Sequence, residues 1–99
     1  MKSIGELLRE QRESKQQLLR EVAAALEMDT ALLSKIERDE RKPSKEQVLA
    51  FAKYYKIKPD DLLVALLSDK LASEVMDEDY GLKAMQVAEE KVKYHQRKK

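Results

Sequence analysis

Apolar residues recur at helical spacing along most of the chain, and this periodicity limits the possible folds more than any other feature. The first segment shows the i, i+3, i+4, i+7 pattern of one helix face at Ile4, Leu7, Leu8 and Gln11. Similar patterns return in every later segment, and no stretch alternates apolar and polar residues as a half-buried strand does. Only two Gly and two Pro occur in 99 residues, so few positions interrupt a helix. The sequence therefore predicts an all-α fold.

Residues that favour helix ends divide the chain into short helices. Ser3 with Glu6, and Ser44 with Gln47, have the spacing of capping boxes. Asp29 is a favourable N-cap, and a Pro at position 59 suits the first turn of a helix. These signals predict helices over residues 3–14, 18–26, 30–38, 44–55 and from 59 onward. The fifth helix continues to about Met76 or breaks near Ser68-Asp69, and a last helix follows the polar segment 77–79.

Composition excludes several classes of protein. The absence of cysteine rules out disulfides and thiolate zinc sites. No apolar run approaches the ~18 residues of a membrane span, and the first 14 residues lack the apolar block of a signal peptide, so we expect a cytoplasmic protein that contacts no membrane. His95 is the one histidine, and neither a Gly-rich phosphate loop nor His-Glu-x-x-His is present. We expect no catalytic residue, metal, cofactor or small-molecule substrate.

The segment Leu18–Pro43 carries the strongest functional signal. It contains two short helices joined by a tight turn, Glu27 to Asp29, and a basic loop follows the second helix. On a helical projection Leu32, Leu33 and Ile36 gather on one side, which leaves an outer face of short polar side chains and a cation. One helix that braces across the DNA backbone, followed by another that presents such side chains to base edges, is the arrangement that enters a major groove.

This outer face and the loop after it form the candidate DNA interface. We expect base contacts from Thr30, Ala31, Ser34 and Lys35. We expect phosphate contacts from Arg20, Arg38, Arg41 and Lys42. Tyr54, Tyr55 and Tyr80 are assigned to packing rather than to base stacking. Because the whole chain carries a net charge of only +1, binding must depend on this local basic patch, and we expect moderate electrostatic affinity.

The same residues resemble a known family. The run Leu33 to Arg38, then Arg41 to Ser44, then Val48 to Ala52, is similar to the Cro/repressor-type helix-turn-helix regulators, also called the xenobiotic-response-element family. The resemblance covers Ile4 to about Leu67. It implies a five-helix, lambda-repressor-like DNA-binding domain and a role in transcription regulation. It also implies a buried structural ion pair, because Arg12 and Glu37 match the positions of such a pair in many members.

Three sites depart from the family pattern. Members often have Thr-Gln where this chain has Leu18-Leu19, and that Gln commonly contacts a phosphate. Members often have Gly where this chain has Glu27 and Asp39. Glu27 must therefore either adopt a left-handed backbone conformation or indicate a different turn geometry.

Residues 69–99 form a helical extension beyond the predicted DNA-binding domain of residues 1–68. The extension carries an apolar stripe that needs cover, either from a second copy of the chain or from the chain's own domain. The candidate dimerisation residues are Leu71, Val75, Leu82, Met85 and Val92. A homodimer would present two recognition helices to a palindromic site. We therefore predict a sequence-specific regulator, a repressor, that binds double-stranded DNA as a homodimer.

Two alternatives remain open from the sequence. Proteins with this fold also act as interaction modules, such as antitoxins or bridging factors, and the extension favours that class. Compact regulators of this kind also resemble the controller proteins of restriction–modification loci.

Overall fold

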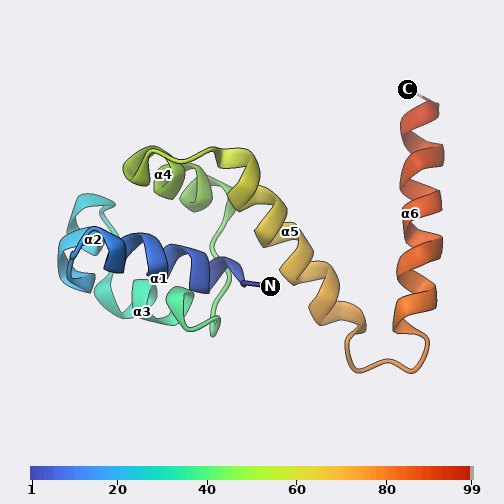
Figure 1. The fold of residues 1–99 in the computed structure, drawn as a ribbon, viewed down its shortest axis with the longest axis horizontal. Coiled ribbons are helices and arrows are strands. Elements are labelled where there is room, and N and C mark those ends of the chain that lie inside the picture. The colour runs from blue at the N-terminus through green and yellow to red at the C-terminus, as the bar shows by residue number, and fades with distance from the viewer. Residues whose placement is uncertain (99) are drawn as a thin grey trace. The chain divides into compact units, whose positions relative to one another are not determined.

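The computed structural model describes residues 1–98, and in that range it contains six α-helices and no strand. The helices are α1 (Ile4–Ser14), α2 (Leu19–Ala25), α3 (Thr30–Glu37), α4 (Lys45–Tyr55), α5 (Pro59–Val75) and α6 (Gly81–Arg97) (Figure 1). The predicted all-α fold is confirmed. Helix α5 is continuous from Pro59 to Val75, so the alternative with a break near Ser68-Asp69 is wrong.

The chain divides into two compact units, one from Met1 to Asp69 and one from Lys70 onward. All five helices of the first unit contribute to one core. Its buried hydrophobic residues are Ile4, Leu8, Val22, Ala23, Leu33, Ile36, Val48, Phe51, Ala52, Tyr55, Leu62 and Leu66. A fully buried Leu, Ile or Phe stabilises a fold by about 1.5–3 kcal/mol relative to an exposed one. The first unit is therefore built around a core of its own.

The predicted helix caps are present at the starts of α1, α3 and α4. The Glu6 N–H donates to Ser3 Oγ at 3.1 Å, and the Ser3 N–H donates back to the Glu6 carboxylate at 3.2 Å. Ser44 and Gln47 make the same reciprocal pair at 3.1 and 2.9 Å. Asp29 accepts from the Ala31 N–H at 3.0 Å. Each bond satisfies a backbone donor that the helix itself leaves without a partner.

Two carboxylates from distant segments also bind the first turn of α1. Asp39, which follows α3, accepts from the Gly5 N–H at 3.1 Å and from the Ser3 hydroxyl at 2.6 Å. Asp69, in α5, accepts from the Ile4 N–H at 2.9 Å. Negative charge is favourable at a helix N-terminus, where the backbone N–H groups point outward. These bonds join the start of α1 to the segment that follows α3 and to α5.

The second unit contains the end of α5 and the whole of α6. Within residues 70–98 no hydrophobic side chain is buried, and Gly81 is the one buried residue of α6. The start of α6 lies against the backbone of Val75, and a Cβ at Gly81 would collide with the Val75 carbonyl oxygen, so the close approach requires glycine. Tyr80 is 81% exposed, so its assignment to packing is wrong. It precedes α6 in the turn and belongs to no apolar helix face. No helix in the described part of the chain has both the length and the apolar character to span a bilayer.

Candidate DNA interface

A left-handed residue makes the turn between α2 and α3. Glu27 has φ 53°, and the Met28 N–H donates to the Ala23 carbonyl at 2.8 Å, which turns the chain sharply before Asp29 caps α3. Of the two alternatives for Glu27, the left-handed conformation is the one observed. A residue with a Cβ loses roughly 1–2 kcal/mol in this conformation relative to the right-handed one. The turn is therefore maintained by the packing of the two helices it joins.

Helix α3 has a buried side and an outer side. Leu33 and Ile36 are fully buried in the core, and Leu32 is half-buried at its edge. The outer side holds the four residues predicted to contact bases. Thr30, Ala31 and Lys35 are exposed and Ser34 is half-buried. A single eight-residue helix therefore presents all four side chains away from the core.

An ion pair joins α1 to the last residue of α3. Arg12 Nε lies 2.9 Å from one carboxylate oxygen of Glu37, and Arg12 Nη2 lies 3.0 Å from the other. The Glu37 side chain is 4% exposed and that of Arg12 is 15% exposed. The hydrogen bonds to Glu37 raise the pKa of Arg12 above its ordinary value. A fork of two parallel bonds is the strongest arrangement for this pair of groups, and it fixes the end of α3 against α1.

A comparison with known proteins places this arrangement in a family. Residues 3–66 match the family model described as a helix-turn-helix domain. The matched region begins at the cap of α1, ends at the last core residue of α5 and covers more than half of the chain. The chain belongs to this helix-turn-helix family. No match was found among the curated proteins or among the solved structures. A helix-turn-helix domain is a DNA-binding module, so DNA is the partner that the match indicates.

Gln17 and Leu18, which precede α2, make contacts that the sequence did not predict. Gln17 donates through Nε2 to the Tyr54 hydroxyl at 2.6 Å, and the backbone carbonyl oxygen of Gln17 accepts from Arg12 Nη1 at 3.0 Å. Leu18 cannot cap α2 with its side chain, and its N–H instead donates to the Glu21 carboxylate at 2.8 Å. The segment between α1 and α2 is therefore hydrogen-bonded to both α1 and α4.

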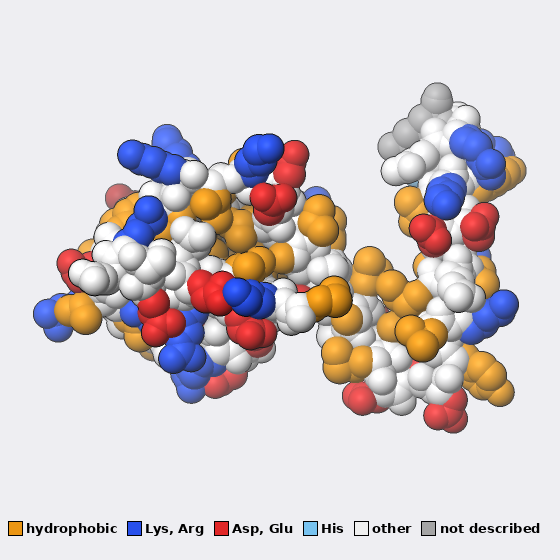
Figure 2. Space-filling view, viewed as in Figure 1, with side chains coloured by type: hydrophobic (Ala, Val, Ile, Leu, Met, Phe, Trp, Pro, Cys, Tyr) orange, Lys and Arg blue, Asp and Glu red, His pale blue; other side chains and the backbone are white. Residues whose placement is uncertain are grey.

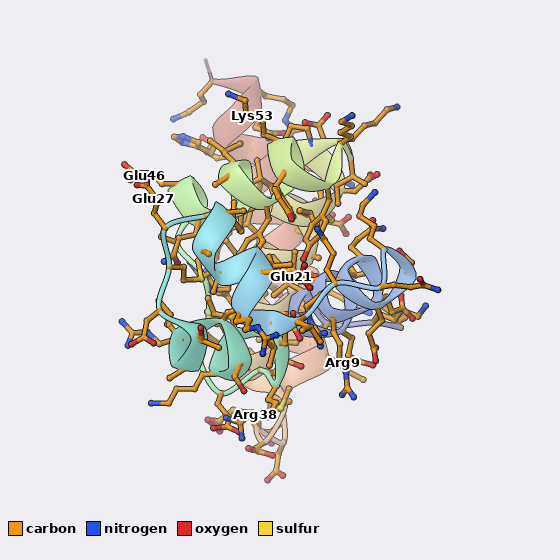
Figure 3. All side chains as sticks on the ribbon, turned by 90° about the vertical axis from the view of Figure 1, so that its left-hand side faces the viewer. Arg9, Glu21, Glu27, Arg38, Glu46 and Lys53 are labelled. Carbon is orange, nitrogen blue, oxygen red and sulfur yellow. The ribbon has the colours of Figure 1, made fainter. Side chains whose placement is uncertain are left out.

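The predicted phosphate-contacting side chains are all exposed. Arg38 caps the C-terminus of α3, Arg41 and Lys42 lie in the loop before the buried Pro43, and Arg20 lies on α2. Arg38 is paired with Glu40 at 2.8 Å. Figure 3 shows α3 and Arg38 toward the lower end of the view, and Lys53 of α4 at the upper end. On the face in Figure 2, Lys and Arg side chains are interspersed with Asp and Glu.

Proposed function

We propose that this protein is a sequence-specific regulator of transcription that reads duplex DNA with the outer side of α3. The observation that carries the proposal is the set Thr30, Ser34 and Lys35, which lies on the second helix of a helix-turn-helix domain and precedes a loop with Arg41 and Lys42. Lysine recognises guanine O6 and N7, and Ser or Thr hydroxyls bond to several base edges. The loop cations would set the register through phosphates, which carry no sequence information.

The Cro/repressor type is the subfamily that we propose. Its support lies in the Arg12–Glu37 ion pair and in the left-handed backbone at Glu27 and Asp39, with φ of 53° and 61°. These are the positions at which the resembling family has an ion pair and two glycines. We propose repression because a DNA-binding domain that occupies a promoter excludes other proteins from it by its volume alone.

We further propose that the protein binds as a homodimer through the second unit. Leu71, Met85, Ala88 and Val92 line an open apolar hollow of about 620 Å³. Leu82 is 85% exposed and Val92 is 55% exposed, while Met85 and Val75 are half-buried. Burial of each such side chain by a second copy would contribute up to ~1.5–3 kcal/mol. Two-fold pairing would hold two recognition helices one DNA turn apart, roughly 34–36 Å.

The test begins with selection of bound duplexes from fragmented genomic DNA, followed by titration of a selected and a scrambled duplex near physiological salt. Lys35→Ala should weaken binding to the selected duplex by ~1–3 kcal/mol and relax the preference at one or two base pairs. Lys53→Ala is the matched control, because Lys53 is an exposed lysine on α4 and lies at the opposite end of the view in Figure 3 from α3. Equal loss on both duplexes would make Lys35 a phosphate contact. Absence of duplex binding by the unaltered chain would refute the proposed function.

A second candidate function has one specific observation in its favour. Helix α6 exposes Val87 and Tyr94 on a different side from Met85 and Val92. One contact with a second copy would cover only one of these sides. A protein-interaction module of the antitoxin or bridging type would use the other. Retention of a second protein by the full chain, lost with Val87→Glu and Tyr94→Glu together, would support this function.

A further inference from the structure

A hollow in the first unit lies beside α3, and three arginines line it. Its volume is about 190 Å³, and it is lined by Arg9, Arg12, Leu19, Ser34, Glu37 and Arg38. These residues come from α1, α2 and α3 and from the C-cap of α3. Figure 3 shows Arg9 and Arg38 in the lower half of the view, where α3 lies. The lining residues, three arginines and one glutamate, carry a formal charge of +2 among themselves. Glu13 and Glu40, which pair with Arg9 and Arg38, lie outside the lining.

We propose that Arg9 binds a phosphate of the DNA backbone, and that the hollow between Arg9 and Arg38 receives one phosphodiester group. The proposal rests on the proposed function. Ser34 lies on the outer side of α3 and also lines the hollow. When α3 enters a major groove, the DNA phosphate backbone at the edge of that groove would therefore lie over the hollow. A guanidinium group suits this task, because its planar fork matches two phosphate oxygens.

The three arginines of the hollow differ in their freedom to bind. Arg12 is 15% exposed and its donors are directed at Glu37 and at the Gln17 carbonyl oxygen, so it holds the protein together. The side chains of Arg9 and Arg38 are 58% and 54% exposed. Arg9 and Arg38 are therefore the residues that can turn toward a phosphate. The sequence predicts this role for Arg38 but not for Arg9, because helical projection of α1 marks Arg9 only as a solvent-facing residue.

Each of the two exposed arginines has a carboxylate neighbour that a phosphate would displace. Arg9 Nε lies 3.4 Å from Glu13 Oε1, and Arg38 Nη1 lies 2.8 Å from Glu40 Oε2. All four side chains are about half-exposed, and ion pairs of this kind contribute little to stability. The replacement of either carboxylate by a phosphate therefore costs little free energy. Because Glu13 and a phosphate would bind the same guanidinium group, Glu13 competes with DNA for Arg9.

The salt dependence of binding tests the Arg9 contact in the full chain. With the selected duplex, Arg9→Ala should reduce the magnitude of the slope of log K against log salt concentration by about one. It should also weaken binding to the selected duplex and to a scrambled duplex by the same factor, because a phosphate contact carries no sequence information. Arg9→Lys should restore the slope, and Lys53→Ala should leave it unchanged. An unchanged slope for Arg9→Ala in a chain that binds through Lys35 would overturn this inference and leave the proposed function standing. An unaltered chain that binds no duplex would overturn both.

A double-mutant cycle tests the competition. Glu13→Gln should tighten duplex binding about two- to fivefold, which is the range expected for release of one exposed ion pair. The gain should disappear in the Arg9→Ala background, since no arginine remains to be released. A gain of equal size in both backgrounds would show that Glu13 acts on DNA through its own charge, and would overturn the competition with Arg9.

Discussion

Glu37 is the one buried charged residue within residues 1–98. Its carboxylate is compensated by Arg12 from another helix. A charge so deeply buried is tolerated only when its partner and hydrogen bonds are in place. We expect the pair to fix how α1 packs against α3 in addition to any net stability that it contributes.

Glu37→Gln should lower the free energy of unfolding by ~3–5 kcal/mol, because Arg12 would remain in a low-dielectric site without its counter-charge. Urea unfolding followed by circular dichroism would measure the change. Glu13→Gln is the matched control, since Glu13 is about half-exposed and should shift stability by less than about 1 kcal/mol. A loss below half a kcal/mol for Glu37→Gln would contradict the buried pair.

Tyr55 is buried, and its hydroxyl has no hydrogen-bond partner among the described residues. Burial raises the pKa of the Tyr55 phenol above its ordinary value, and the nearby Glu37 carboxylate raises it further. In the unfolded chain the phenol ionises near pH 10, whereas in the folded chain it stays neutral. Ionisation of this phenol therefore has no effect on the stability below pH 10, and the stability falls as the pH rises above 10.

Tyr55→Phe should leave the stability at pH 7 unchanged or raise it by up to about 2 kcal/mol, because it removes a buried hydroxyl without a partner. It should also make the loss of stability above pH 10 less steep. Thermal unfolding at pH 7, 9 and 11 would show both effects. Tyr54→Phe should instead destabilise at pH 7, since it removes the bond to Gln17. A loss of more than 1 kcal/mol for Tyr55→Phe would mean that its hydroxyl is satisfied.

Among the elements, the helix starts could be predicted from the sequence because capping is a local interaction. Ser3, Asp29 and Ser44 bond to groups two or three residues away, and the sequence contains both partners. The inner and outer sides of α3 could be predicted because helical geometry fixes them. Contacts such as Gln17 with Tyr54 join residues 37 positions apart, and no local pattern specifies them. The role of Arg9 was hidden for the same reason, since its hollow exists only after α1 and α3 pack.

Gly5 is required where α1 approaches the end of α3. A Cβ at this position would lie 2.5 Å from the Ile36 carbonyl oxygen and 2.8 Å from that of Glu37. Both are backbone atoms that cannot rotate away. Gly5→Ala should therefore destabilise the domain by about 1–3 kcal/mol, although Ala favours a helix by up to about 1 kcal/mol. Chemical unfolding would measure it, and a stabilised variant would show that α1 and α3 can separate at little cost.

For the whole molecule, the two units differ in how they are stabilised. The first has a core drawn from five helices, and residues 70–98 contain no buried hydrophobic side chain. A helix such as α6 gains most of its stability from the packing of its apolar side, and in this chain that side is only partly covered. The first unit is expected to fold from its own sequence, and the second is expected to need a partner.

Met85→Glu together with Val92→Glu should convert a dimer into a monomer without unfolding the first unit, because both residues line the apolar hollow. Sedimentation at tens of micromolar would measure the assembly. The matched control places the same two charges seven residues apart on the other exposed side, with Val87→Glu and Tyr94→Glu. Dissociation by the control alone would move the interface to that side. An unaltered chain that sediments as a monomer would refute the homodimer.

The lack of buried apolar side chains in residues 70–98 has a consequence for how such a protein would respond to its abundance in a cell. If the second unit becomes ordered only when two chains meet, its folding and its assembly are the same event. At low saturation, occupancy of a two-part DNA site would then follow the square of the protein concentration, so halving expression would lower occupancy about fourfold. If the chain is the regulator proposed above, its target gene would respond more steeply than in proportion to the amount of protein.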